Sequence, residues 1–524
     1  MTGERSGKPS RGIGRSTAIF AFWTGISRIA GLAREILAAA IFGTQGSIAA
    51  FVIAFQVPNF LRSLVADSAL SAAFLPVFTE LEEQGRRREA QRLVGALIGV
   101  ITMGLGAITL VAIVAAPWIM PVLAPGLSPK LIDQTVHLAQ IMFPIVVLLG
   151  LTGLVSAVLQ ANGEFGATAF APVLWNVVII VGLAAVTPVV PDGKRITVYA
   201  VAIVAGTTVQ LLYLLPSMRG KGPFPFSLGI GNREVRRVLL LMLPVTLGLG
   251  LINVNLLVDG AFASLVSDGS VRAIDAAFRL YLLPQGVFSV AIATVLFPTI
   301  SRLAARADIV GLRRTLAFGL RQIFFMLLPA SAFLLVLSEP VVRLAFQRGQ
   351  FDAQSTALTS DALVFFAIGL AFNGASLLVI RAFFSLQLPW LATKVAALGV
   401  VLNAALDAIF YKPLGTGGIP LSTSISSAVT FAVMLYLLER ELGGLHLAWL
   451  VDGALRGLLA SLVSALLAWS SWKVLDDALG QSFPAQLVSM TAALTAATLA
   501  YAAAAHAFEM PELAQLSRLG RPLR

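Results

Sequence analysis

The chain has 524 residues, of which 58% are hydrophobic and only 12% are charged, and it contains no cysteine. Soluble globular proteins carry about 25% charged residues, so this composition excludes one or two soluble domains and indicates a membrane protein. The net charge of +11 then indicates basic loops beside anionic lipid rather than binding to nucleic acid. The absence of cysteine excludes disulfides, thiolate metal sites and cysteine nucleophiles.

Apolar segments long enough to cross a membrane recur along the whole chain. A helix needs about 20 such residues to cross a hydrocarbon core of about 30 Å, whereas the strands of a membrane barrel show about 10 residues of alternating polarity. The sequence therefore predicts an all-α, polytopic membrane protein with about fourteen transmembrane helices. The predicted spans are 17–41, 47–78, 93–118, 135–160, 168–188, 196–216, 236–264, 272–300, 315–342, 358–384, 391–411, 418–438, 447–472 and 484–508.

Lysine and arginine are distributed unevenly between the two sides that this span order defines. The two tails and the even-numbered connections hold 21 of them, and the odd-numbered connections hold 8. Because cytoplasmic loops carry the excess of basic residues, both termini are predicted to be cytoplasmic. The first apolar segment follows a basic stretch but is interrupted by Arg28, Arg34 and Glu35, so we expect a retained helix rather than a cleaved signal peptide.

Two parts of the sequence resemble one another at an offset of 222 to 223 residues. GSIAAFVIAF at Gly46–Phe55 matches GSVRAIDAAF at Gly269–Phe278, and Pro76 aligns with Pro298. Chance similarity between alanine-rich helices is the alternative, but the order and spacing of the matches favour a duplicated bundle. We expect an N-terminal lobe of helices 1–6 (residues 1–226), a C-terminal lobe of helices 7–12 (residues 227–442), and two extra helices with a cytoplasmic tail (residues 443–524). Transporters built from parallel repeats bind their substrate between the halves.

Eight basic residues remain within the predicted spans or at their ends. Placing such a residue at a helix centre costs about 2.5 to 3.5 kcal/mol on insertion scales, so each needs a physical reason. Arg456 lies one turn after Asp452, which predicts an ion pair within one helix. Arg321, Arg381 and Lys394 are predicted to lie near helix ends and to extend to the membrane surface.

The other four basic residues are arginines of the first two helices and of the helix that the repeat makes equivalent to the second. They are Arg28, Arg34, Arg62 and Arg279, and the nearby acids are Glu35, Asp67 and Asp275. One interpretation is that acids and backbone carbonyls satisfy all four. The other is a cationic chamber for an anionic substrate, because the guanidinium fork matches phosphate oxygens and stays charged.

A second polar set lies in the later helices. Asn255 and Asp259 are one turn apart, as are Asn403 and Asp407, and Thr423 could add a hydroxyl. Oxygen ligands without histidine or cysteine suit a hard cation such as Na⁺, or a carboxylate that takes up a proton. Ordinary hydrogen bonding between helices is the alternative.

Catalytic chemistry has little support in this sequence. The only histidines, His137, His446 and His506, are far apart, and no zincin, nucleophile-elbow or P-loop motif is present. We therefore expect a protein that is not an enzyme and that has no catalytic residues. Without an ATP-binding domain on this chain, transport would depend on an ion gradient, the membrane potential or the gradient of the substrate.

Several segments carry a resemblance to a known family. They are GISRIAGLAREILAAAIFG (residues 25–43), AFQVPNFLRSLVADSALSAAFLPVF (54–78), LQANGEFGATAFAPVLWN (159–176), FRLYLLPQGVFSVAIATVLFPTIS (278–301) and NAALD (403–407). Together they resemble the MurJ (MviN) lipid II flippases, which belong to the multidrug, oligosaccharidyl-lipid and polysaccharide exporter superfamily. The resemblance covers essentially the whole chain. It implies two six-helix lobes around a central cavity, and a lipid-accessible groove formed by the last two helices.

The resemblance also implies a function and a set of site residues. The function is translocation of undecaprenyl-diphosphate-linked peptidoglycan precursor from the inner to the outer leaflet of the bacterial cytoplasmic (inner) membrane by alternating access. The implied partners are lipid II, membrane lipids and the cell-wall synthesis machinery, with no nucleic acid. The family's essential arginines fall on Arg28, Arg34, Arg62 and Arg279, with acidic companions at Glu35 and Asp67. The Na⁺ ligands of some members fall on Asp259, Asn403, Asp407, the carbonyl of Ile419 and Thr423.

Three other functions are weighed against this one. A flippase for another polyprenyl-linked glycan, or a drug exporter, would share the fold, but an exporter of cationic drugs should have acids where this first lobe has arginines. A non-transporting scaffold for cell-wall assembly would use the charges as packing pairs. A membrane glycosyltransferase or lipid phosphatase would need clustered catalytic residues.

Overall fold

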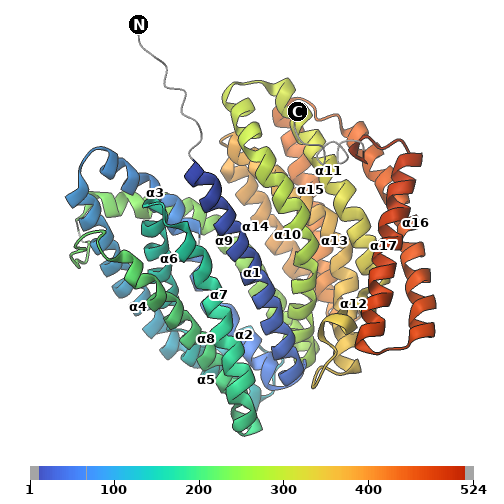
Figure 1. Cartoon of the computed structure of the whole chain (residues 1–524), viewed down its shortest axis with the longest axis horizontal. Helices are drawn as coiled ribbons and strands as arrows, with labels where there is room; N and C mark the ends of the chain where they lie inside the picture. Colours follow the sequence, from blue (N-terminus) through green and yellow to red (C-terminus); the bar gives the residue numbers. More distant parts are fainter. Residues whose placement is uncertain (1–10, 66–67, 230, 514–524) are drawn as a thin grey trace. The chain divides into compact units, whose positions relative to one another are not determined.

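The computed structural model describes residues 11–65, 68–229 and 231–513, and these residues form helices and connections without any β-strand (Figure 1). Short 3₁₀ or π turns occupy residues 182–189, 215–218 and 415–417. The α-helices are α1 (Arg11–Phe42), α2 (Ser47–Val65), α3 (Ser68–Glu83), α4 (Arg87–Leu123), α5 (Pro129–Met142), α6 (Ile145–Ala161), α7 (Phe165–Val181), α8 (Asp192–Leu214), α9 (Arg233–Val266), α10 (Asp268–Ala305), α11 (Ile309–Val336), α12 (Ser338–Phe346), α13 (Ala353–Ser385), α14 (Pro389–Phe410), α15 (Gly418–Leu442), α16 (Leu447–Leu479) and α17 (Phe483–Ala507).

Eleven helical stretches of the described residues are long and apolar enough to cross a membrane, and residues 47–62 and 253–266 form shorter apolar helices. This confirms the predicted all-α, polytopic fold, while the exact number of fourteen spans stays a prediction. Three predicted spans do not correspond to single helices, and one of them, 135–160, covers both α5 and α6. The span 47–78 covers both α2 and α3, and the span 315–342 runs past the end of α11 at Val336 into the short helix α12. An apolar run cannot reveal where one helix ends and the next begins, because the residues on both sides of the break are apolar.

The chain divides into two compact units, Met1–Leu257 and Val258–Arg524, and the boundary lies within α9. The three-part division at residues 226 and 442 stays a prediction. The two sequence repeats differ locally. In the first, Pro76 lies in α3, a helix separate from α2, whereas in the second the aligned Pro298 lies inside the continuous helix α10.

In the first unit, α1 packs against α7, α7 against α8, α2 against α5, and α4 against α6. Tyr199 of α8 stacks on Phe51 of α2, with ring centroids 4.1 Å apart. Two glycines of α4 allow an extended segment to cross this helix, because a Cβ at Gly95 or Gly99 would collide with the carbonyl oxygen of Pro225 or Ser227. The connection between α8 and α9 is thereby held against α4.

In the second unit, α13 is the central helix, since it packs against α10, α11 and α15. The contact between α13 and α15 is close. Ser424 donates to the carbonyl of Phe365 at 2.6 Å and accepts from the backbone N–H of Gly369, where a Cβ would clash with Ser424. The last two helices, α16 and α17, pack against each other, and α16 packs on α11.

Helix α16 is held to α11 near its N-terminus by Arg321. This side chain is only 4% exposed, forms an ion pair with Glu512 after α17, and lies over the ring of Trp449 at 3.9 Å. It also donates to the Trp449 carbonyl at 3.2 Å. The prediction that Arg321 extends to the membrane surface from a helix end was therefore wrong. Arg321 lies in the interior of α11, and the carboxylate that makes its burial tolerable lies 191 residues away in sequence.

A similar contact holds the other end of α16. Arg343 of α12 lies 3.5 Å from Asp476 and over the ring of Trp472 at 5.8 Å, and both charged side chains are almost fully buried. The span order had placed Arg343 in a connecting loop. By contrast, the predicted ion pair between Arg456 and Asp452 is confirmed, at 2.9 Å with both side chains about half exposed.

We predict that Glu512→Gln destabilises the protein by about 3 to 5 kcal/mol, because it leaves the buried charge of Arg321 without its carboxylate. Asp452→Asn is the control: it breaks an ion pair whose two side chains are about half exposed, and it should cost less than about 1 kcal/mol. Thermal unfolding of both variants in detergent tests this. Equal stability of the two variants would contradict the importance of burial.

Candidate functional site

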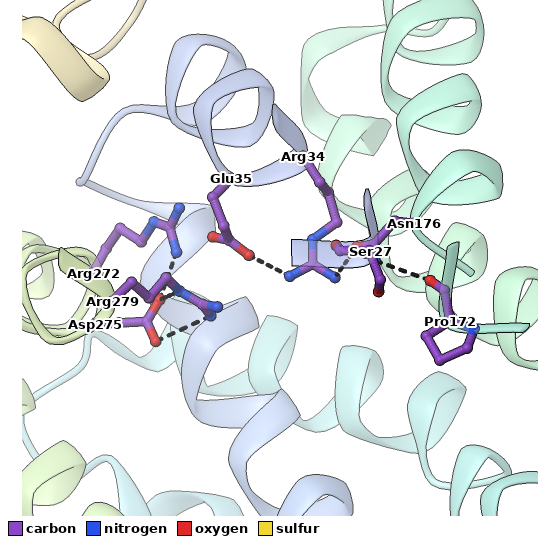
Figure 2. A network of polar contacts seen from close by, with 8 residues as sticks. All are labelled: Ser27, Arg34, Glu35, Pro172, Asn176, Arg272, Asp275 and Arg279. Atoms are coloured by element: carbon purple, nitrogen blue, oxygen red, sulfur yellow. Dashed lines mark hydrogen bonds and ion pairs between the residues drawn. The ribbon is translucent and has the colours of Figure 1, made fainter. Parts of the chain in front are cut away.

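Arg34 of α1 is the most completely enclosed of the four predicted substrate-binding arginines. Its side chain is 9% exposed, and Nη2 lies 2.6 Å from Oε1 of the buried Glu35. Nη1 donates to Oδ1 of Asn176 in α7 at 3.1 Å, and the guanidinium group lies 4.6 Å from the ring centroid of Trp175. Figure 2 shows Arg34 between Glu35 on one side and Asn176 on the other. The contact with Glu35 agrees with the interpretation in which acids pair with these arginines, and Asn176 adds a contact from a second helix.

The other predicted residues of the first unit differ in their surroundings. Arg28 lies on the exposed side of α1. Arg62, in the last turn of α2, is half-buried and donates from Nε to Oδ1 of Asn59 at 3.1 Å. Asp67 lies outside the described residues. Burial therefore distinguishes Arg34 from Arg28 and Arg62, although the sequence predicts the same role for all three.

In the second unit, Arg279 of α10 belongs to a small charged cluster. It contacts Asp275 one turn earlier at 3.1 and 3.2 Å, and Asp275 also accepts from Arg272 at 2.6 Å (Figure 2). The Arg272 side chain is 3% exposed, whereas that of Arg279 is 37% exposed. Asp275 is thus shared between a buried and an accessible guanidinium group.

Arg272 and Asn176 were not identified as site residues from the sequence. Arg272 was counted with the connections because it is the first residue of the predicted span 272–300, but it lies in the first turns of α10, and its spacing of three residues from Asp275 was the available signal. Asn176 was quoted only as the end of a motif. An amide in the middle of an apolar helix was the signal there, because such a group needs hydrogen-bond partners in a membrane.

The second predicted site is assembled within the second unit. Asn403 of α14 donates to Oδ1 of Asp259 in α9 at 2.6 Å and to Oδ2 of Asp407 at 3.1 Å. The side chains of all three are buried, with exposed fractions of 6% for Asp259, 1% for Asn403 and 0% for Asp407. Asp259 and Asp407 lie close enough for each to affect the charge of the other, and Thr423 and Ser422 of α15 lie beside Asp259 and Asp407, respectively, with their hydroxyls donating to the carbonyls of Ile419 and Gly418. Helices far apart in sequence therefore meet at the predicted residues.

The donor set of this site fits a small hard cation. Two carboxylates in contact cannot both stay ionised in an apolar surrounding without a cation or a proton between them. The oxygens Oδ1 of Asn403 and Oδ1 of Asp407 are buried and have no hydrogen-bond partner among the described residues. The buried carbonyl of Ile419 accepts from Thr423 at 3.3 Å, which places both predicted α15 ligands on one turn. Asn255 lies one turn before Asp259 in the same helix and is half-buried.

Buried guanidinium groups on helices of membrane-spanning length, together with a carboxylate site formed by three helices, define a multi-pass membrane transporter. The family is shown by the sequence itself. A family model described as lipid II flippase MurJ matches residues 38–488, and the chain belongs to this family.

Curated members of this family match most of the length of this chain. The lipid II flippase MurJ of Burkholderia cenocepacia is 32% identical over 434 residues, which cover 80% of this chain and 82% of the relative. A probable lipid II flippase MurJ of Vibrio cholerae is 29% identical over 487 residues and covers 89% of this chain and 92% of the relative. The family is one of flippases, so this chain is classed as a transporter and not as an enzyme.

Solved structures show the same fold. A lipid II flippase MurJ in an inward closed conformation is similar with a TM-score of 0.77 at 22% identity, covering 93% of this chain and 99% of that one. An inward-facing multidrug resistance MATE transporter of the MOP superfamily is similar with a TM-score of 0.70 at 15% identity, covering 80% and 94%. These similarities show that the chain shares its fold with both transporters.

Proposed function

We propose that this chain is a lipid II flippase of the bacterial cytoplasmic membrane, which moves the undecaprenyl-diphosphate-linked peptidoglycan precursor from the inner to the outer leaflet. The observation that carries the proposal is the buried Arg34 network on a membrane helix of a chain in the MurJ family. Placing a guanidinium group inside a membrane costs free energy, so such groups usually face a partner or a transport pathway. A diphosphate is a suitable ligand, because it offers several charged oxygens to guanidinium forks.

In this mechanism Arg28, Arg34, Arg62 and Arg279 bind the diphosphate, and Glu35 and Asp67 balance the cluster when no substrate is present. Glu35 lies on the same guanidinium group that the diphosphate would approach, so substrate and Glu35 compete for Arg34. Arg279 is accessible, because its side chain is 37% exposed while Arg272 takes the more buried side of Asp275. The two units then alternate between inward-open and outward-open states.

The polyprenyl tail has an apolar surface available in the second unit. A cavity of about 540 Å³ lies among α10, α11 and α17, with Leu283, Pro284, Phe325, Phe333 and Ala497 among the residues that line it. The tail would reach this surface from the lipid, so van der Waals packing rather than transfer from water would hold it there. The tail would remain at this surface while the head group crosses the membrane. The translocated precursor would then pass to the enzymes that polymerise it, which are the proposed protein partners.

We predict that Arg34→Ala and Arg279→Ala each lower the appearance of lipid II at the outer leaflet at least tenfold, because each removes a charged contact to the diphosphate worth more than about 1.4 kcal/mol. Accessibility of labelled lipid II in a depletion strain is the measurement. Arg456→Ala is the matched control, since it removes an arginine whose partners are Asp452 and the Phe508 carbonyl. Normal growth and normal flipping by well-expressed Arg34→Ala protein would contradict the mechanism and favour a scaffold. Flipping of other polyprenyl-linked glycans but not of lipid II would favour the related substrate.

We also propose that both termini are cytoplasmic, on the basis of the 21 to 8 distribution of basic residues. Because the chain has no cysteine, a single introduced thiol is the only labelling site. A membrane-impermeant maleimide should label Gln481→Cys, between α16 and α17, in intact cells, and Arg88→Cys, at the start of α4, only after the cells are opened. The reverse pattern would invert the topology.

Finally, we propose that Asp259, Asn403, Asp407, the carbonyl of Ile419 and Thr423 bind Na⁺, which biases the return of the empty transporter. The buried oxygens of Asn403 and Asp407 that lack hydrogen-bond partners support this site. A cation held between the two carboxylates would relieve their repulsion and stabilise the folded state.

We predict that NaCl raises the melting temperature of the wild-type protein above its value in choline chloride at equal ionic strength. The difference should disappear in the Asp259→Asn/Asp407→Asn variant, because the amides carry no charge for the cation. Asp361→Asn is the control, since Asp361 is an exposed carboxylate of the same unit that accepts from the backbone of Gly417. Equal Na⁺ dependence in all three proteins would place cation binding elsewhere.

A further inference from the structure

Asn176 of α7 is buried, with 4% of its surface exposed, and its amide has a fixed orientation. Nδ2 lies 3.0 Å from the carbonyl oxygen of Pro172 and 3.4 Å from that of Ser27 in α1. Carbonyl oxygens only accept hydrogen bonds, so the NH₂ group must face them, and Oδ1 must face the opposite way. In that direction it accepts from Nη1 of Arg34 at 3.1 Å (Figure 2).

The neighbouring Trp175 supports the same guanidinium group from its face. The Arg34 carbon Cζ lies 4.6 Å from the Trp175 ring centroid. The ring itself is anchored, because Nε1 of Trp175 donates to Oγ1 of Thr207 in α8 at 3.1 Å. Thr207 is fully buried and donates in turn to the carbonyl of Ile203. Arg34 is therefore held by two consecutive residues of α7, one at an edge of the guanidinium group and one at its face.

The chemical nature of this support distinguishes it from an ordinary ion pair. Glu35 both orients Arg34 and cancels its charge, whereas an amide and an indole ring orient the group while leaving its charge in place. When an anion displaces Glu35 from Nη2, the contacts to Asn176 and Trp175 remain available. The remaining contacts then keep the guanidinium group in position without competing for the anion.

We infer that Asn176 and Trp175 are positioning residues for the binding of the diphosphate, acting through Arg34 and fixed by Thr207. This inference rests on the proposed function, since it assumes that Arg34 contacts the substrate. Preorganisation of this kind raises affinity because the side chain loses less conformational freedom on binding. It also makes the contribution of Arg34 dependent on residues of α7 and α8, which the sequence motifs of α1 and α2 do not contain.

The experiment measures the affinity of purified lipid II for the full-length protein in nanodiscs of phosphatidylethanolamine and phosphatidylglycerol, at a series of salt concentrations. Asn176→Leu should weaken binding about tenfold and Thr207→Val about threefold. Two matched controls should bind as the wild-type protein does. Thr208→Val removes a hydroxyl that bonds only within its own helix, and Gln140→Leu removes an amide that bridges to Ile113 of α4.

A salt series and a double variant separate positioning from a general structural effect. Screening by salt weakens charged contacts, so both Arg34→Ala and Asn176→Leu should make the affinity less dependent on salt. The double variant should bind no more weakly than Arg34→Ala alone, because both changes remove the same contact. Asn176→Asp keeps an oxygen towards Arg34 but adds a charge that cancels the guanidinium group and places a second oxygen against the carbonyls of Ser27 and Pro172, so it should weaken binding and lower the melting temperature.

The outcomes separate this inference from the proposed function. If Arg34→Ala binds lipid II weakly while Asn176→Leu shows the affinity and salt dependence of the wild-type protein, or if the two changes add in the double variant, the positioning role is wrong and the proposed function stands. If Arg34→Ala itself binds as the wild-type protein does, the role of Arg34 in the proposed function fails and the positioning role fails with it.

Discussion

The cost of placing a guanidinium group among apolar helices is the constraint on which the rest of this structure depends. Each deeply buried arginine described here has a carboxylate partner: Glu35 for Arg34, Asp275 for Arg272, Glu512 for Arg321 and Asp476 for Arg343. Three of the four also lie over a tryptophan ring. These contacts make burial tolerable, and they tie helices together because the partners often come from other helices.

The same constraint separates two uses of arginine. Around α16, the ion pairs of Arg321 and Arg343 hold the last two helices against α11 and α12, and their partners are almost fully buried. On α10 two guanidinium groups share one acid, and on α1 the guanidinium group of Arg34 also contacts an amide and an indole ring, which would hold it if an anion displaced Glu35. A membrane transporter of an anionic lipid needs both uses, since a rigid body must carry arginines that can exchange an acid for the ligand.

Part of the candidate site could be predicted from the sequence. The i,i+4 pairs, Asp452 with Arg456 and Asp275 with Arg279, follow from helical spacing alone, and both are present. Asp259 and Asp407 were selected as polar groups in apolar helices, and the structure brings them into contact through Asn403. The interpretation of Arg321 was wrong and the role of Asn176 was missed, because their partners lie 191 and 142 residues away and no local pattern shows them.

The sequence by itself determined that this is an all-helical, multi-pass membrane protein of the MurJ family, because length, apolar content and motif spacing are local properties of the chain. The tertiary structure decided which charges are buried and what each one contacts. It showed that Arg34 is enclosed by α7 while Arg28 is exposed, although both lie on one helix. Which face of a helix meets another helix depends on packing between distant segments, and that packing alone assigns a buried charge its partner.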